Sequence, residues 1–274
     1  MSAFLPVIFD ELVQRLAIGL EPRDAVSETR IARPVDIAID GKPDFDVDAG
    51  PWPEPNPVAG LPRLARHGSG RFVLLFGPTV GKKDKVRLRL VPLGRRYVPR
   101  RMEFDINSLG LVLAAERLGL DVPTTNRTWR PRLFPGAGYD LAETATGIRG
   151  TVTKAGKPVR WTRIEASVNG SIIGRAHGDD RGEFLLVLGQ NTGAVGDLVS
   201  PLPVTITVKA RNPALAVNPK DALADLQVET AAGPGVTPDD VSTGIAPTPN
   251  YVQVAQLSDH PLPLGRLSSV PIAV

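Results

Sequence analysis

The chain of 274 residues contains no cysteine, which excludes a disulfide framework, a thiolate nucleophile and a cysteine-based metal site. Its three histidines, His67, His177 and His260, lack the i, i+2 or i, i+4 spacing of paired metal ligands. No stretch reaches the roughly 18 apolar residues of a membrane span. The start of the sequence lacks the basic region of a secretory signal. We therefore expect a protein that is made in the cytosol, has no membrane span and is held together by packing.

Two segments have the look of binding loops, but each lacks residues that such a loop needs. Residues 44–48 alternate aspartates as a calcium loop does, yet Ala49 and Pro55 stand where the glycine and the bidentate glutamate belong. Residues 77–83 are one residue short of a phosphate loop, and Lys83 replaces its hydroxyl residue. The net charge of +3 does not favour nucleic acid as a partner. We predict no catalytic, cofactor-binding or metal-binding residue and no enzymatic activity.

Glycine and proline are abundant, with 27 residues of each. Both residues favour turns and short strands over long helices. A hydrophobic content of 42% with 22% charged residues is typical of a globular protein. The composition therefore predicts an all-β fold with extended connections.

The pattern of apolar residues divides the chain into five parts. Val35, Ile37 and Ile39 alternate with polar residues as in a strand, and similar runs follow as far as residue 106. Residues 109–120 are expected to form either a short helix, which Gly119 and Pro123 would end, or a looped linker. We predict an N-terminal segment (1–24), a first β-sandwich-like domain (25–106), a linker with the short helix (107–147), a second sandwich (148–212) and an extended C-terminal arm (213–274). The arm is expected to dock either back onto this chain or onto another one.

Residues 148–189 are the most informative stretch. They contain two strand pairs, each joined by a glycine-containing turn, the first around Ala155 and Gly156. In the second pair, Ile164, Ala166 and Val168 alternate with polar residues as a half-buried strand does. A resemblance to a known family depends on the following residues of this stretch: Gly150, Val152, residues 156–159, Ala166, Val168 and residues 180–184.

This pattern resembles the carboxypeptidase regulatory-like domain, a transthyretin-like sandwich of the Ig type. In that family the domain is an accessory or scaffold unit, and no catalytic residue is assigned to it. With the first domain at residues 25–106, the expected fold is all-β, with two Ig/transthyretin-like β-sandwiches, Pro/Gly-rich connectors and the extended C-terminal arm.

Three further stretches, residues 95–101, 132–139 and 146–150, are similar to proteins encoded with phage-tail-like contractile injection systems. The resemblance implies a structural or adaptor subunit that is made in the cytosol and incorporated into a tail-like particle. Its expected partners are other protein subunits, including further copies of itself. The alternative is a glycan- or surface-binding module in which Trp52, Trp129 and the tyrosines act as stacking platforms.

Basic residues cluster along residues 85–101, and next to Val86, Leu88 and Leu90 they alternate with apolar ones and therefore line one face of a strand. This face is either a sheet surface paired with Glu103 and Asp105 or a docking face for an acidic subunit. Aromatic residues after residue 128 are expected to pack onto a neighbouring domain. The predicted interaction residues are Arg87, Arg89, Arg95, Arg96, Arg100, Arg101, Trp129, Phe134, Tyr139 and Tyr251.

Overall fold

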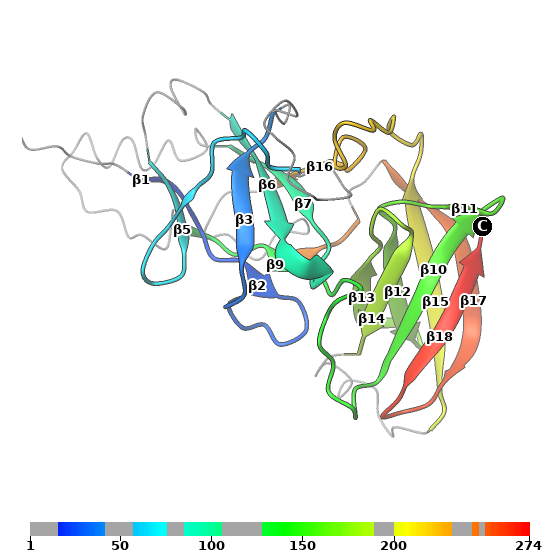
Figure 1. Cartoon of the computed structure of the whole chain (residues 1–274). Coiled ribbons are helices and arrows are strands. Elements are labelled where there is room, and N and C mark those ends of the chain that lie inside the picture. The colour runs from blue at the N-terminus through cyan, green and yellow to red at the C-terminus, as the bar shows by residue number, and fades with distance from the viewer. Residues whose placement is uncertain are drawn as a thin grey trace, which may run out of the picture.

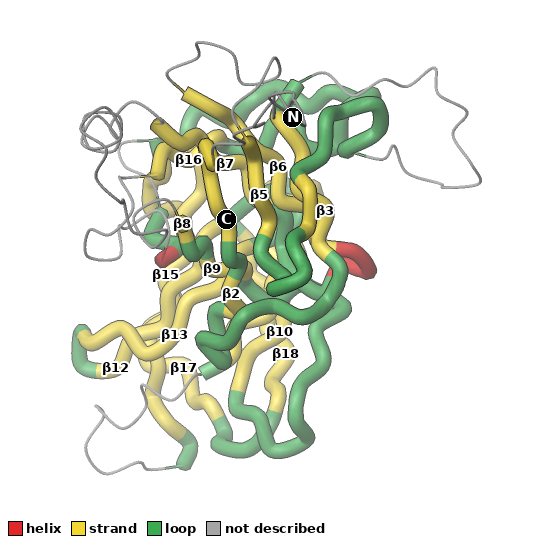
Figure 2. Tube along the Cα trace, turned by 90° about the vertical axis from the view of Figure 1, so that its left-hand side faces the viewer, coloured by secondary structure: helices red, strands yellow, loops and turns green. Residues whose placement is uncertain are grey.

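The computed structural model describes residues 16–41, 57–75, 85–105, 128–188, 200–231, 243–246 and 250–274. Within these ranges the chain forms strands β1 to β18 and one short 3-10 turn, η1 (Leu93–Arg95). Figures 1 and 2 show the strands gathered into two lobes that lie against each other. The predicted all-β class is confirmed. The predicted helix at 109–120 and the two loop-like segments at 44–48 and 77–83 lie outside the described residues.

The first lobe contains two four-stranded sheets and one strand pair. One sheet has the order β4 (Ala65–Arg66), β5 (Phe72–Leu75), β1 (Leu16–Leu20), β8 (Thr128–Trp129). The other has the order β16 (Val228–Ala231), β7 (Arg100–Asp105), β6 (Lys85–Pro92), β3 (Val35–Ile39). The pair is formed by β2 (Arg23–Asp24) and β9 (Arg132–Leu133).

The core of the first lobe follows from the alternation along its strands. On β6, Val86, Leu88 and Leu90 are buried in the cluster that also contains residues of β1, β3 and β5. Phe104 of β7 meets Trp129 of β8 edge to face, with ring centroids 5.3 Å apart. The arginines of β6 consequently point to the opposite face of their sheet.

The second lobe is sandwich-like, with two sheets around one core. In one sheet, β10 (Gly147–Lys154) pairs with β11 (Lys157–Pro158), β14 (Glu183–Val187) and β18 (Leu267–Ala273). The other has the order β13 (Ser171–His177), β12 (Arg163–Val168), β15 (Leu202–Arg211), β17 (Tyr251–Leu262). Buried aliphatic residues of both sheets, among them Ile148, Ile164 and Ile206, form the common core.

Two glycines of the second lobe sit at positions that favour glycine, one for its backbone conformation and one for lack of space. The predicted turn after β10 is confirmed, with positive φ at Ala155 (48°) and Gly156 (75°). At Gly150, an added Cβ would stand 2.1 Å from the carbonyl oxygen of Val270. Gly150 therefore permits the close approach of β18 to β10.

The last part of the predicted extended arm is not extended: residues 251–273 form two strands of the second lobe, which is the expected alternative of docking back onto this chain. Strand β17 pairs antiparallel with β15 from Tyr251 to Leu262, and β18 pairs parallel with β10. Pro261, Pro263 and Pro271 interrupt this stretch of the sequence. However, β17 and β18 are edge strands, on which a proline such as Pro271 can sit without removing a ladder hydrogen bond.

The first lobe contains strands from parts of the chain that were predicted to lie outside the first domain. Strands β1 and β2 belong to the first lobe, although residues 1–24 were expected to be a separate segment. Strands β8 and β9, inside the predicted linker, pair in parallel with β1 and β2. Strand β16, inside the predicted arm, pairs in parallel with β7. The chain therefore returns to the first lobe after it has formed most of the second.

A first prediction tests whether β18 contributes to stability. Ile272 of β18 is 3% exposed in the second core, so Ile272→Ala should lower the free energy of unfolding by about 2–4 kcal/mol through the cavity it leaves. Ser269→Ala, at an exposed position of the same strand, is the control and should change it by less than about 0.5 kcal/mol. Urea unfolding followed by circular dichroism measures both. Equal stability of the two variants would contradict the assignment of β18 to the core.

Candidate functional site at the seam between the lobes

The arginine face of β6 and β7 is directed into the molecule for much of its length. Arg87 is exposed and pairs with Glu103, with 2.6 Å between Nε and the carboxylate, as one of the two sequence-based alternatives expected. Arg89, on the same face, is 1% exposed, and Arg100, on the opposite face beside Leu90, is 0% exposed. These two side chains are therefore not available to a partner. They bind acidic residues of the chain itself.

Arg89 is held from two sides. Its guanidinium donates to both carboxylate oxygens of Asp221 at 2.7 and 2.8 Å and to Asp40 at 2.5 Å. Asp40 also accepts from Arg101 at 2.7 Å, and Arg101 donates further to the carbonyl oxygens of Leu223 and Leu226. The connection between β15 and β16 thus lies over the arginine face and covers it.

Glu229 of β16 joins the two lobes. Its carboxylate accepts from Arg100 of β7 at 2.5 Å and from Arg163 of β12 at 2.9 Å, and all three side chains are at most 2% exposed. Arg100 belongs to the first lobe and Arg163 to the second. A buried charge needs a partner and further hydrogen bonds, and the carbonyl oxygens of Arg132 and Trp161 supply acceptors for these guanidinium groups.

Two more arginines form ion pairs at the interface between the two lobes, which we call the seam. Arg160 donates to both carboxylate oxygens of Asp225 at 2.5 and 2.9 Å. Arg95 of η1 lies 3.6 Å from Asp179 and 3.5 Å from Asp180, in the turn before β14. Of the predicted interaction residues, Arg96 stays within the first lobe, where it pairs with Asp140.

The predicted aromatic interaction residues are also used internally. Trp129 is 4% exposed in the first core, and Tyr139 shares the carboxylate of Asp24 with Tyr97. Burial and the adjacent Asp24 raise the pKa of both phenols. Tyr251 donates to the carbonyl oxygen of Trp161 at 2.9 Å. Trp129 and Tyr251 are thus buried and Tyr139 is half-buried, while Trp52 lies outside the described residues.

Phe134 and His177 form an aromatic contact across the seam. Their rings stack with centroids 3.9 Å apart, and His177 Nε2 lies 3.1 Å from the carbonyl oxygen of Gly244. Gly244 has φ of 87°, and a Cβ there would collide with the ring of Phe134. Burial and then the charges of Arg163 and Arg100 hold the pKa of His177 well below its ordinary value of 6.5. His177 is therefore neutral in the folded protein at neutral pH.

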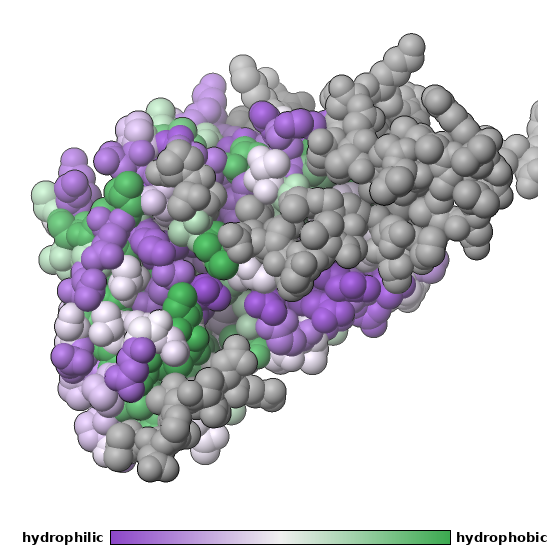
Figure 3. Space-filling view, turned by 180° about the vertical axis from the view of Figure 1, so that it is seen from behind, coloured by the Kyte–Doolittle hydropathy of each residue, from purple (hydrophilic) through white to green (hydrophobic). Residues whose placement is uncertain are grey.

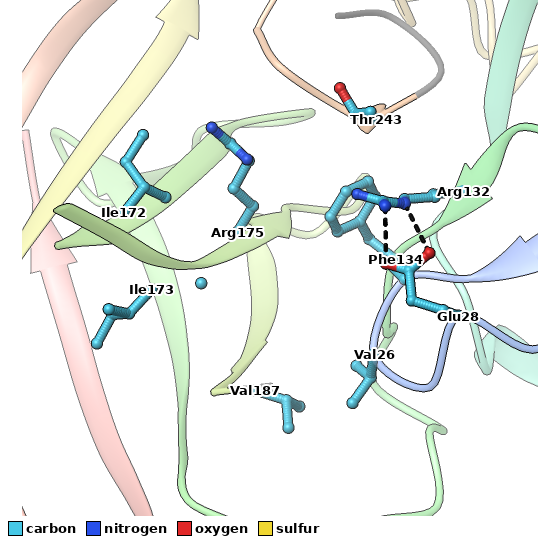
Figure 4. A pocket seen from close by; sticks show the side chains of 11 residues that line it. Val26, Glu28, Arg132, Phe134, Ile172, Ile173, Arg175, Val187 and Thr243 are labelled. Carbon is cyan, nitrogen blue, oxygen red and sulfur yellow. Dashed lines mark hydrogen bonds and ion pairs between the residues drawn. The ribbon is translucent and has the colours of Figure 1, made fainter. Parts of the chain in front are cut away.

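A cavity of about 150 Å³ opens beside this contact. Figure 4 shows Arg175 of β13 on one side of the cavity and, on the other, Phe134 beside the ion pair of Arg132 with Glu28. The rest of its wall includes Thr243 and aliphatic residues, among them Ile172, which is 43% exposed. Both arginines already have carboxylate partners, because Arg175 donates to Glu165. A second cavity of about 160 Å³ lies at the seam near Trp161.

The acids that hold the seam were missed by the sequence analysis. Asp40, Asp221 and Glu229 stand singly in the sequence, and up to 132 positions separate an arginine from its partner. No local spacing signals such a pair. The one usable signal was the clustering of arginines, which requires compensating charge if the face is buried.

The described residues hold no group of three or more His, Asp or Glu side chains suited to a metal ion. No helix among them has the length and hydropathy to cross a membrane. No family model matches the chain, and no curated protein matches it.

Among solved structures, the chain is similar to a 9R-lipoxygenase from Cyanothece PCC8801, with 10% identity and a TM-score of 0.29. The match covers 49% of this chain and 17% of the lipoxygenase. A lipoxygenase is an enzyme, so this finding contradicts the prediction of no enzymatic activity, which we withdraw. A TM-score this low assigns no activity to the chain.

Replacing Glu229 tests the buried ion pairs of the seam. Glu229→Gln keeps the shape of the side chain but leaves Arg100 and Arg163 without a counter-charge, so the free energy of unfolding should fall by about 3–5 kcal/mol. Glu28→Gln removes the partner of Arg132 at a site where the carboxylate is 48% exposed. This control should cost less than about 1 kcal/mol. Denaturant unfolding at neutral pH compares them, and a loss for Glu229→Gln no larger than the control's would refute the role assigned to Glu229.

The buried His177 predicts a pH dependence of stability. The unfolded chain takes up a proton on His177 below its ordinary pKa of 6.5, whereas the folded protein does not. The stability associated with neutral His177 is thus complete above pH 6.5 and is lost as pH falls below it, by at most about 1.4 kcal/mol per pH unit. His177→Phe should show a shallower decline between pH 7 and 5.5. His67→Phe, at an exposed histidine, should keep the wild-type slope, and identical slopes for all three proteins would argue against a neutral buried His177.

Proposed function

We propose that the chain is a structural or adaptor subunit that joins other proteins in a larger assembly. The assembly that the sequence resemblance favours is a phage-tail-like contractile injection particle. We further propose that both lobes are Ig/transthyretin-like sandwiches and that the second is a carboxypeptidase regulatory-like domain. Support for this fold comes from the two sheets and common core of the second lobe, and from the turns at Gly156 and Gly182.

An adaptor has to hold its contact surfaces in a fixed relation. Here the two lobes are joined by buried ion pairs of Glu229, Asp221 and Asp225 and by the stacked rings of Phe134 and His177. Buried charges separate only at a large cost in free energy, so the lobes move as one body. This rigidity supports a role in assembly.

The docking surface expected at the arginines has to be sought elsewhere, because Arg89 and Arg100 are covered. The observation that carries the proposal is the edge strand β17, on whose outer side no other described strand pairs. Its residues 251–258 include no charged side chain, and Val252 and Val254 are 39% and 37% exposed. Exposed edge strands are normally protected by charged residues, proline or a covering segment, and on β17 Asp259 and Pro261 protect only the end of the strand, beyond residues 251–258.

We infer that the partner is a protein subunit that adds a β-strand to β17. Strand addition satisfies the outward backbone groups of the edge strand, and alternate side chains such as Val252 and Val254 supply the apolar contacts. Figure 3, in which the molecule is seen from behind, shows hydrophobic groups scattered between hydrophilic ones on the second lobe. The edge of the sheet, with its unpaired backbone groups, is therefore favoured over a flat apolar face as the contact.

The test introduces lysine at the proposed edge. The double variant Val252→Lys and Val254→Lys places two charges where the added strand would lie, which opposes strand pairing. Tagged protein is recovered from its own cells, and the native complex is imaged by electron microscopy. We expect the wild type in a tail-like particle and at least a tenfold loss of association for the double variant.

Val217→Lys is the matched control, because Val217 is 59% exposed but lies outside the sheets. It should assemble as the wild type does, and circular dichroism should show that all variants are folded. A wild-type protein that stays monomeric in its own cells would overturn the proposed function. Assembly of the double variant at the wild-type level would overturn β17 as the docking site.

A further inference from the structure

Five arginines of the first lobe lie side by side in its β structure, apart from the covered arginines of β6 and β7. One belongs to β2 and one to β9, and the others flank β2, β5 and β8, which lie next to one another in Figure 2. We call this group the arginine patch, and it consists of Arg23, Arg30, Arg71, Arg130 and Arg132.

Arg23 of β2 stands between two other arginines in the backbone register. It forms an antiparallel bridge with Arg30 and pairs in parallel with Arg132 of β9. The backbone hydrogen bonds that flank the bridge, 2.9 and 3.0 Å long, make Arg23 and Arg30 a non-hydrogen-bonded pair, the kind that brings side chains closer together. Residues directly opposite each other point to the same face of a sheet, so the three side chains form a row.

A second row, two residues earlier along the same segment, is centred on Glu21. The register of β1 with β5 and with β8 continues by one residue and places Glu21 between Arg71 and Arg130. Its carboxylate lies 2.7 Å from Nε of Arg71, 3.2 Å from Nη2 of Arg23 and 3.6 Å from Nε of Arg130. One carboxylate is thus shared by three guanidinium groups.

The arginine patch carries a surplus of positive charge. Its ion pairs use two carboxylates, Glu21 and Glu28, the second of which binds Arg132 at 2.9 Å. Five guanidinium groups and two carboxylates leave three positive charges uncompensated. Burial favours a higher pKa for Glu21, but the hydrogen bonds from Arg71 and Arg23 outweigh it and hold that pKa below its ordinary value of 4.5. Glu21 is therefore ionised at neutral pH, and the surplus remains three.

The side chains of the arginine patch are accessible to a partner. Four of them are 32–47% exposed, and Arg30 is exposed as well. Arg71 donates to Glu21 through Nε, and the terminal nitrogens of Arg71 and Arg130 donate to none of the described residues. A guanidinium group in this state keeps donors in a planar fork that fits a further carboxylate or phosphate.

The pairing of Arg23 with Arg30 opposes the stability of the lobe. Like charges directly opposite each other on neighbouring strands are destabilising. Arg30 binds no carboxylate among the described residues, and its guanidinium donates to the carbonyl oxygen of Ser69. An arrangement that breaks a local rule without an evident structural gain is typical of a functional site.

The geometry of the arginine patch favours carboxylates of a protein over the phosphates of nucleic acid. Successive residues on one face of a strand are about 6.6–6.8 Å apart, so the rows of Arg23 and Glu21 match the spacing of alternate side chains in an extended peptide. Phe72 and Trp129, which adjoin the patch in the sequence, are 8% and 4% exposed, so neither ring can stack on a base.

We propose that the arginine patch binds an acidic segment of another protein, an extended chain with aspartate or glutamate at alternate positions. The carboxylates of the segment accept hydrogen bonds from the guanidinium groups of the two rows. The patch lies on the first lobe and β17 on the second, so the chain presents one contact surface on each lobe. The inference does not rest on the proposed function, because it is tested on the isolated chain.

The first experiment titrates the full chain with a synthetic peptide in which glutamate alternates with serine, followed by calorimetry. We expect a dissociation constant on the order of 0.1 mM in 0.1 M salt. In 1 M salt the affinity should fall at least tenfold, because the Debye length shrinks from about 10 Å to about 3 Å. A peptide with glutamine in place of glutamate should not bind. Oligothymidylate of the same charge as the acidic peptide should bind at least tenfold more weakly than that peptide, because it finds no ring to stack on.

The second experiment removes charge from the arginine patch. The double variant Arg30→Gln and Arg130→Gln leaves Glu21 with two arginines, and the affinity for the acidic peptide should fall about tenfold. Its urea midpoint should equal or exceed that of the wild type, because like charges have been separated. The matched control, Arg149→Gln and Arg266→Gln, removes the same charge at exposed positions of the second lobe and should change the affinity less than about twofold.

A third variant changes the affinity in the opposite direction. Glu28 competes with the peptide for Arg132, so Glu28→Gln should tighten binding about threefold. A purely structural role of this ion pair would not strengthen binding. Glu28 is 48% exposed, so the variant is expected to fold as the wild type does, which circular dichroism checks.

Absence of saturable binding of the acidic peptide to the wild type overturns the inference. An equal loss of affinity in the patch variant and its matched control also overturns it, because net charge alone would then explain binding. Oligothymidylate that binds as tightly as the peptide would replace the acidic protein by nucleic acid. If the double variant does not fold, the result for Glu28→Gln decides, and unchanged affinity there counts against the patch. Failure of the patch leaves the assembly test of β17 unaffected, because the two tests share no residue.

Discussion

The structure depends on one buried carboxylate, that of Glu229, which lies between an arginine from each lobe. An isolated buried charge is unstable, so once β16 places Glu229 beside β7, Arg100 and Arg163 have to approach it together. The rest of the seam follows the same principle. Asp221 and Asp225 bring the connection before β16 onto Arg89 and Arg160, and that connection in turn shapes the cavity beside Trp161.

This arrangement explains why few of the basic side chains of β6 and β7 are exposed, although the chain has 32 lysines and arginines. Arg89 and Arg100 serve as internal cross-links, for which the planar guanidinium is well suited because it donates in several directions at once. Each lobe has a hydrophobic core of its own, and the ion pairs, together with the stacked rings of Phe134 and His177, select the relative position of the lobes. A carboxylate in the wrong place would leave an arginine buried and unpaired.

Local patterns in the sequence predicted the strands well and the long-range contacts poorly. The alternation at Ile164, Ala166 and Val168 and the turn at Gly156 identified β12 and the β10–β11 pair, because both patterns are complete within a few residues. The basic run of β6 was visible, but the partner of Arg89 is 132 positions away and carries no signature. The sequence left open whether residues 251–273 dock onto this chain or onto another one, since a sequence does not show that a strand with prolines will lie at an edge. The left-handed backbone of Trp161, with φ of 59°, was invisible as well, because the surroundings impose it.

The order in which the chain visits its lobes has a consequence for how the protein is made. After β1 to β9 the chain forms β10 to β15 in the second lobe, returns with β16 to the first, and finishes with β17 and β18 in the second. During synthesis, the first lobe lacks both β16 and its central carboxylate until residue 231 has emerged, and the second lacks an outer strand on each sheet until residue 273 has emerged. Native pairing is therefore delayed until β16, β17 and β18 have been synthesised, and the two lobes should fold in one late, cooperative step rather than one after the other.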